Sequence, residues 1–206
     1  EKLRSRAVPY LRRTLGVIFQ DFRLISDKSV YENVAFAMRV IGAPEKEIQK
    51  RVPYVLELVG LETKGRRLPN ELSGGEQQRV AIARALVNNP SVIIADEPIS
   101  ALDMSIRAQV LNLLRHLQKE RGITYLFIAH DLSVMRYISD RIAVIHKGDI
   151  VELADAEELV THAIHPYTRS LLSAIPLPNP VVEKRRVAET YDYATSGIDY
   201  TQGTNH

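Results

Sequence analysis

The sequence predicts an α/β protein in which helices pack on a mostly parallel sheet. Short runs that are apolar on both faces, typical of strands buried in such a sheet, alternate with stretches in which apolar residues recur every three or four positions. This alternation of strands and helices is the pattern of an α/β fold. The 206 residues are enough for one ordinary domain, or for one domain with an appendage. Hydrophobic residues make up 45% of the chain and charged residues 25%, which argues against overall disorder.

Composition excludes several classes of function. The formal net charge is only +2, which gives no sign of general nucleic-acid binding. Cysteine is absent, so disulfides, Cys-ligated zinc and Cys-ligated iron–sulfur clusters are ruled out. No apolar run approaches the roughly 18–20 residues needed to cross a bilayer. No secretory leader is visible at the start of the chain.

Five strands are expected. Three apolar runs should form the buried sheet, and two later runs flank a Lys-Gly-Asp turn, which predicts a hairpin. The expected strands are residues 15–19, 92–95, 123–129, 141–146 and 150–153.

Four helical patterns lie between these strands, and residues 21–70 form a helical insertion without a convincing strand. Pro53 interrupts the second pattern and argues against an unbroken helix there. A third helix is expected over residues 74–88 and a fourth over 105–121. The positions expected to face the core are Val30, Val34, Met38 and Ile41; Ile48, Val52, Leu56 and Val59; Val80, Ala81, Ala85 and Leu86; and Ile106, Val110, Leu113, Leu114 and Leu117. Beyond residue 175, prolines followed by polar residues predict a surface-hugging or disordered tail.

Polar residues follow three of the strands. Gln20 comes after the first, Asp96 and Glu97 after the second, and His130 after the third. Ligands of open α/β sheets bind beyond the carboxyl ends of the strands, so these residues indicate a site at one sheet edge. Asp96 can hold Mg²⁺ directly or through water, and Glu97 can orient or deprotonate a water for attack on a phosphate. The alternative interpretation of the acid pair is an acidic surface turn.

Residues 72–76 read Leu-Ser-Gly-Gly-Glu. Ser73 and Glu76 form the pattern of a capping box at a helix start. Gly74 and Gly75 are costly in a first helical turn, which suggests that something approaches the backbone closely. An anion at the helix N-terminus fits, because free N–H groups and the helix dipole both point at it.

The stretch LSGGEQQRVAIARAL, followed by VIIADEP, resembles the signature motif and Walker B of ABC-type ATPases. Gln20 falls where that family has its Q-loop, residues 100–103 (SALD) resemble its D-loop, and His130 resembles its switch histidine. Five motifs in the family's order make a chance match negligible. The resemblance implies a P-loop NTPase core with a helical subdomain. It divides the chain into the end of an N-terminal lobe (1–20), the helical subdomain (21–70), the ATPase core (71–154) and a C-terminal extension (155–206).

The resemblance also implies roles and ligands. Glu97 is the general base, His130 contacts the γ-phosphate of ATP, and Asp96 and Gln20 serve Mg²⁺. The remaining site residues are expected to contact nucleotide or the dimer partner, which presents its signature motif across the interface: Ser73, Gly74, Gly75, Glu76 and Asp103. Expected partners are transmembrane permease subunits and a second ATP-binding subunit, at the cytoplasmic face of the cell membrane, without nucleic acid. Some relatives hold an iron–sulfur cluster in the extension, which the lack of cysteine excludes here.

One departure is the family's P-loop, G-x-x-x-x-G-K-[ST], which these residues lack. In the family it precedes the Q-loop strand. The basic residues before Gln20 have no glycine loop around them and are interpreted as a solvated face: Lys2, Arg4, Arg6, Arg12 and Arg13. The fold is therefore expected to lack its Walker A part, ATP and Mg²⁺ binding is in doubt, and this chain alone is not expected to hydrolyse ATP.

Two subfamilies are resembled. Residues 9–96 look most like the bacterial cell-division ABC ATPase, whereas the chain from Ile99 onward, including HPYTRSLLSAIPLP, resembles oligopeptide and dipeptide importer ATPases. The expected function is the ATP-binding subunit that drives peptide import. The alternatives are a cell-division ABC ATPase and a non-catalytic module. DNA-repair relatives are rejected, because they place a long coiled coil between the Q-loop and the signature.

Overall fold

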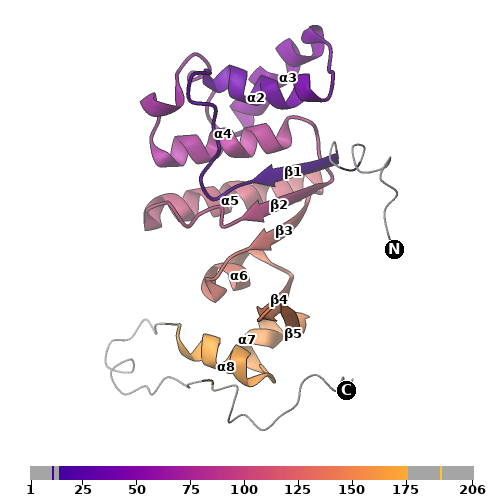
Figure 1. The fold of residues 1–206 in the computed structure, drawn as a ribbon, viewed down its shortest axis with the longest axis vertical. Helices are drawn as coiled ribbons and strands as arrows, with labels where there is room; N and C mark the ends of the chain where they lie inside the picture. The colour runs from indigo at the N-terminus through magenta and orange to yellow at the C-terminus, as the bar shows by residue number, and fades with distance from the viewer. Residues whose placement is uncertain (1–10, 12–13, 176–190, 192–206) are drawn as a thin grey trace. The chain divides into compact units, whose positions relative to one another are not determined.

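The computed structural model describes residues 11, 14–175 and 191. It contains two compact units, one ending at Ile128 and one beginning at Ala129, and each is described by itself (Figure 1). The elements of the first unit are β1 (Leu15–Ile18), α2 (Val30–Val40), α3 (Glu45–Leu58), the 3₁₀ helix η2 (Pro69–Glu71), α4 (Gly74–Leu86), β2 (Val92–Asp96), α5 (Met104–Arg121) and β3 (Thr124–Ile128). Those of the second are α6 (Leu132–Ile138), β4 (Arg141–His146), β5 (Asp149–Asp155), α7 (Ala156–Thr161) and α8 (Pro166–Ser173).

The first unit contains the predicted parallel sheet. Its strands follow the order β1-β2-β3, with β2 in the middle (Figure 1). Ile18 pairs with Ala95, and Asp96 pairs with Ile128. The three strands therefore run in the same direction, and their carboxyl ends lie at one edge.

Helix α4 packs directly against β1 and against α5. The approach is close at Gly16, where an added Cβ would lie 2.8 Å from the carbonyl oxygen of Ala85 and 2.9 Å from Cγ1 of Ile93. Only a residue without a side chain fits between the strand and the helix.

The insertion between β1 and α4 is helical, as predicted. The apolar positions expected to face the core of α2 and α3 are buried, except Ile41, which is half-buried and caps α2. The break expected at Pro53 is absent, because α3 is continuous through it. Pro53 is exposed. Gln49, whose carbonyl loses its helical partner there, is also exposed, so water can solvate that carbonyl.

The second unit contains the predicted antiparallel hairpin of β4 and β5, with an irregular register between Val144 and Ile145. The hairpin packs with α7 around Ile142, Val144, Ala156 and Leu159. The short helices α6, α7 and α8 were not predicted. With six to eight residues each, they show too few repeats of a helical period to be recognised.

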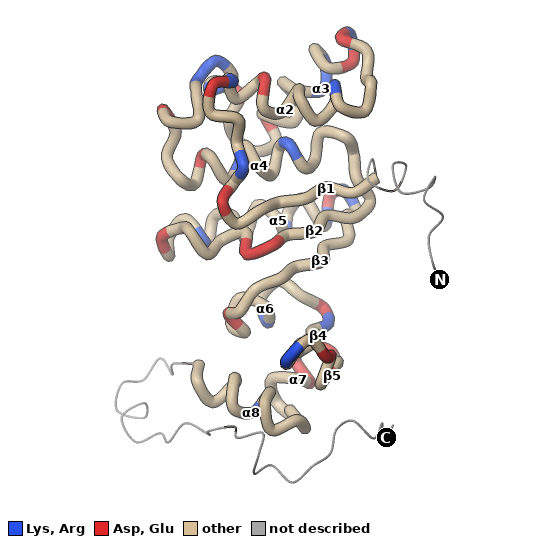
Figure 2. Tube along the Cα trace, viewed as in Figure 1, with Lys and Arg blue, Asp and Glu red and all other residues tan. Residues whose placement is uncertain are grey.

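Residues of both charge signs are spread along α2 and α3 (Figure 2), in keeping with the small net charge. Among the described helices, none is long and apolar enough to cross a membrane. The residues of the predicted basic face lie outside the described residues: Lys2, Arg4, Arg6, Arg12 and Arg13. So does the predicted tail, apart from Tyr191.

Candidate functional site at the carboxyl edge of the sheet

Gln20 and the acid pair follow neighbouring strands at the same sheet edge. Gln20 lies two residues beyond β1 and is exposed, and Asp96 is the last residue of β2 and is also exposed. The pairing of Ile18 with Ala95 places the two loops side by side. The oxygens of an amide and a carboxylate are suitable ligands for Mg²⁺, so the residue types present fit that ion.

Glu97 has an unusual backbone conformation. Its φ is 46°, in the left-handed region that residues with a side chain rarely adopt. Its N–H donates to the carbonyl of Ile128 at 2.9 Å, and its own carbonyl accepts from the N–H and Oγ of Ser100 at 3.2 and 3.0 Å. Backbone in this conformation concentrates at functional sites, because the surrounding contacts must hold it.

The loop after Gln20 bends sharply. Phe22 and Arg23 both have positive φ, at 58° and 48°. Arg84 of α4 donates through Nη2 to the carbonyl of Phe22 at 2.6 Å and through Nη1 to the carbonyl of Arg23. Burial lowers the pKa of the Arg84 guanidinium, an effect that the carboxylate of Asp21 opposes.

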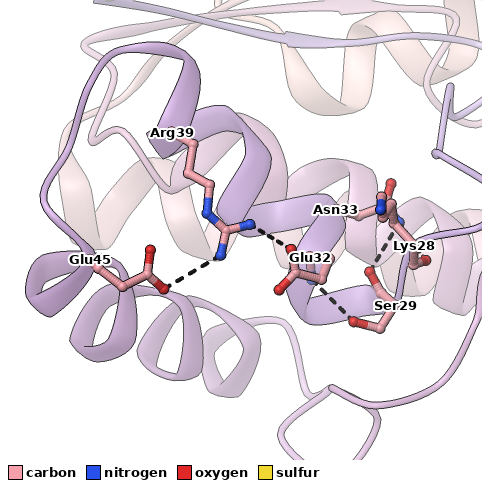
Figure 3. Close-up of polar contacts among 6 residues, drawn as sticks. All are labelled: Lys28, Ser29, Glu32, Asn33, Arg39 and Glu45. Atoms are coloured by element: carbon pink, nitrogen blue, oxygen red, sulfur yellow. Dashed lines mark hydrogen bonds and ion pairs between the residues drawn. The ribbon is translucent and has the colours of Figure 1, made fainter.

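Asn33 of α2 holds the next part of this loop (Figure 3). Its Oδ1 accepts from the N–H of Ile25 at 2.7 Å, and its Nδ2 lies within 3.1 Å of the carbonyls of Ile25, Lys28 and Ser29. Asn33 is fully buried, and backbone groups of the protein take the place of water as its hydrogen-bond partners. The loop is thus anchored to two helices.

The predicted capping box at the start of α4 is confirmed. Ser73 Oγ accepts from the N–H of Glu76 at 3.3 Å, and the Glu76 carboxylate accepts from the N–H of Ser73 at 2.9 Å. The hydrogen bond from the Ser73 N–H holds the pKa of the Glu76 carboxyl below its usual range. The ammonium of Lys64, with Nζ 3.2 Å from Oε1 of Glu76, lowers this pKa further. The carboxylate is therefore ionised near neutral pH and stabilises the helix N-terminus.

The two glycines of this segment have different surroundings. A Cβ at Gly75 would lie 2.6 Å from Cγ2 of Ile106, so the packing of α4 on α5 excludes a side chain there. A Cβ at Gly74 would lie 3.6 Å from Cδ2 of Leu102, an ordinary contact. The inference that Gly75 must leave room for a ligand is therefore unnecessary, because Ile106 already requires the glycine. Phosphate binding by Ser73, Gly74 and Gly75 remains a prediction.

Helix α4 also contacts the turn after Glu97. Gln78 is fully buried, and its Nε2 donates to the carbonyl of Pro98 at 2.5 Å. Together, Ser73, Gln78 and Arg84 connect one helix to three loops of the candidate site.

Asp103 is the N-cap residue before α5 and is exposed, without a side-chain cap bond. The preceding loop is held by Arg107, whose Nε donates to the carbonyl of Leu102 at 2.8 Å and whose Nη2 donates to that of Ser100 at 3.2 Å. These contacts order the segment whose sequence resembles a D-loop.

His130 lies in the second unit, where it is exposed and precedes α6. The neighbouring Asp131 caps α6, with its Oδ1 accepting from the N–H of Ser133 at 2.9 Å. In the part of the chain that the structure describes, no group of three or more His, Asp or Glu side chains is arranged to hold a metal.

Sequence reasoning missed two polar residues of α4, the buried Gln78 and the half-buried Arg84. Gln78 lies one and two turns before Ala81 and Ala85, and Arg84 lies one turn after Val80. A polar side chain on a helical face otherwise expected to be buried is the signal that could have identified them, because such a group needs a specific partner.

Two family models match the chain. Residues 1–100 match "ABC transporter", and residues 151–196 match "Oligopeptide/dipeptide transporter, C-terminal region". Together they cover more than two thirds of the chain.

Curated relatives carry matching descriptions. The chain is 50% identical to the oligopeptide transport ATP-binding protein AmiF of Streptococcus pneumoniae serotype 4 and 51% identical to OppF of Bacillus subtilis strain 168, covering 93% of this chain and 64% of each relative. It is 54% identical to the dipeptide transport ATP-binding protein DppF of Lactococcus lactis, covering 88% of this chain and 60% of that protein. The chain therefore spans a little under two thirds of the length of these relatives.

A solved structure shares the fold. CbiO1 from Clostridium perfringens, part of the ABC transporter complex cbiONQ, superposes with a TM-score of 0.71 at 34% identity, over 78% of this chain and 64% of that one. The fold is therefore the mixed α/β fold of ABC ATPases.

Proposed function

Because the chain belongs to the ABC transporter ATPases and carries the C-terminal region of oligopeptide/dipeptide transporters, we propose that it supplies most of the ATP-binding subunit of a peptide importer. The observation that carries this proposal is the shared sheet edge of Gln20 and the Asp96–Glu97 pair, in a chain about half identical to oligopeptide transport ATP-binding proteins. Parallel register supports the proposal, since it brings the amide of Gln20 and the carboxylates of Asp96 and Glu97 to one sheet edge.

The roles of the site residues follow from their chemistry. Asp96 and Gln20 hold Mg²⁺, which neutralises charge on the phosphates of bound ATP. Glu97 accepts a proton from the attacking water, and its constrained backbone supports a fixed direction for the carboxylate. His130 contacts the γ-phosphate.

The signature segment acts across a dimer in this proposal. Ser73, Gly74 and Gly75 begin a 13-residue helix, whose free N–H groups favour an anion. The anion is the ATP bound by a second ATP-binding subunit, and Glu76 and Asp103 contribute to that interface. Permease subunits at the cytoplasmic face of the membrane are the other partners.

The phosphate-binding loop is not part of these 206 residues. We propose that ATP hydrolysis requires a P-loop segment and that the described chain alone does not turn over ATP. Phosphate release from Mg-ATP by the purified chain tests this point. Turnover that disappears in Glu97→Gln would contradict it, because that variant removes the proposed base while keeping the size of the side chain.

The second candidate function is that of a cell-division ABC ATPase, which the resemblance of residues 9–96 favours. In this family the coupling helix of the membrane subunit docks between the Q-loop and the helical subdomain, so partner choice should follow residues 20–70. The alignments with the oligopeptide transport relatives argue against this second candidate. They cover 93% of the chain and therefore include most of residues 20–70.

Co-purification separates the two functions. A chain completed with the P-loop segment of a peptide-importer ATPase is expressed with the membrane subunits of a peptide permease or with those of the cell-division complex. Peptide-permease capture supports the importer, and capture by the division subunits supports the second candidate. Exchanging residues 21–70 in the same chain shows whether the insertion or the C-terminal extension selects the partner.

A further inference from the structure

The bend after Gln20 carries strain that its own backbone does not explain. Phe22 and Arg23 are consecutive residues with side chains, and both lie in the left-handed region, at φ 58° and 48°. The local backbone bonds run from the N–H of Phe22 to the carbonyl of Phe19 and from the N–H of Arg23 to the carbonyl of Asp21. Two such residues in sequence persist only where outside contacts hold them.

Arg84 provides the outside contact. Its planar guanidinium directs two N–H donors at the neighbouring carbonyls of Phe22 and Arg23, a paired geometry that a lysine ammonium cannot reproduce. The nearby carboxylate of Asp21 accepts from Nε of Arg23 at 3.2 Å. The hydrogen bonds of Arg84 thus hold the backbone carbonyls of the bend directly.

We propose that Arg84 is a positioning residue that holds the bend after Gln20 in place and links it rigidly to the signature segment. Ser73 caps the same helix at its other end, so α4 fixes the spacing between the two motifs. The functional meaning rests on the proposed roles of Gln20 and Ser73. The structural link is independent of them.

Limited trypsin digestion of the 206-residue chain measures the link directly. Arg23 is 61% exposed and is itself a trypsin site, yet a protease needs the bond between Arg23 and Leu24 in an extended conformation. Mass spectrometry measures the rate of cleavage at this bond. The rate should rise about tenfold or more in Arg84→Met, because that variant loses two charge-assisted hydrogen bonds. Arg84→Lys should give a smaller rise.

The matched control is Arg51→Lys. Arg51 also donates to protein oxygens near α4, with Nε 3.1 Å from the carbonyl of Val87 and Nη2 3.2 Å from Oδ1 of Asn89. These oxygens follow Arg84 at the C-terminal end of α4, and Arg51 does not bond the bend. Each rate is divided by cleavage within α5, whose trypsin sites no variant changes, so that global unfolding is separated from local opening.

A second variant tests the strain itself. Glycine adopts positive φ without a steric penalty, so Phe22→Gly should make the bend less dependent on its support. In the Phe22→Gly background, Arg84→Lys should raise cleavage after Arg23 less than it does in the original chain. Equal effects in both backgrounds would contradict the role of strain.

Unchanged relative cleavage after Arg23 in both Arg84 variants, or an equal rise in Arg51→Lys, would overturn the proposal. The functional link is tested in a P-loop-completed chain assembled with its permease. Arg84→Lys should raise the Mg²⁺ concentration for half-maximal ATP hydrolysis several-fold more than Arg51→Lys does. An assembly without any ATPase activity would contradict the proposed function and leave the proteolysis result standing.

Discussion

The two faces of the three-stranded sheet differ in their cover. On the face toward α4, Ile18, Ile93 and Ala95 are fully buried and Phe127 is 9% exposed. On the opposite face, Leu126 is 55% exposed and Ile128 is 47% exposed. Both sets come from the same strands, since successive side chains point to opposite faces.

The difference shows that the described helices cover one face of the sheet and leave the other face open. The strands are apolar at successive positions, as in sheets that are covered on both sides. In the described residues, helices bury only one of these faces well. An apolar face open to water contributes less to stability and favours association.

The largest expected effect contrasts two isoleucines of neighbouring strands. Ile93→Ala on the covered face should reduce the free energy of unfolding by about 3 kcal/mol, because it leaves a cavity. Ile128→Ala on the open face should cost less than about 1 kcal/mol, since its side chain is already half in water. Urea denaturation of both variants measures the difference. Equal costs would show that the open face is covered in solution.

The polar contact on the covered side comes next. Gln78→Leu should cost about 2 kcal/mol, because the buried carbonyl of Pro98 loses its donor. Its neighbour Gln77 donates to the carbonyl of Leu72 at 3.2 Å in a partly exposed setting. Gln77→Leu should therefore cost under about 1 kcal/mol. A loss in Gln77→Leu as large as that in Gln78→Leu would argue against burial as the cause.

Gly75 and Gly74 provide a smaller contrast where α4 meets α5. Gly75→Ala should lower stability by roughly 1 kcal/mol, because the clash with Ile106 outweighs the better helix propensity of alanine. Gly74→Ala should be neutral or slightly stabilising. Thermal melts compare the two variants, and placing Gly75→Ala in an Ile106→Ala background should remove most of its cost. A persistent cost there would point to a cause other than this contact.

The smallest effect on folding is expected on the open face. Leu126→Lys should change the free energy of unfolding by less than about 0.5 kcal/mol, yet it should weaken self-association. Ala108→Lys adds the same charge at an exposed position of α5 and serves as the control. Sedimentation velocity at several concentrations measures association. Identical behaviour of the two variants would mean that charge, and not the apolar face, governs it.

The motifs could be recognised in the sequence because each is a local pattern. The capping box needs only Ser73 and Glu76 three positions apart, and the three sheet strands appear as short apolar runs. The packing requirement for glycine at position 75 could not be predicted, because the contact that excludes a side chain comes from Ile106, 31 positions later.

By itself, the sequence determined the α/β class, the helical insertion and the motifs that relate the chain to ABC ATPases. Periodicity and short spacings are sufficient for these features, since they depend on neighbours along the chain. Only the tertiary structure decided that Arg84 holds the carbonyls of Phe22 and Arg23, about 60 positions away. It also decided which sheet face the helices cover. A donor that is partly withdrawn from water needs an acceptor, but the chain's path in space selects which acceptor is within reach.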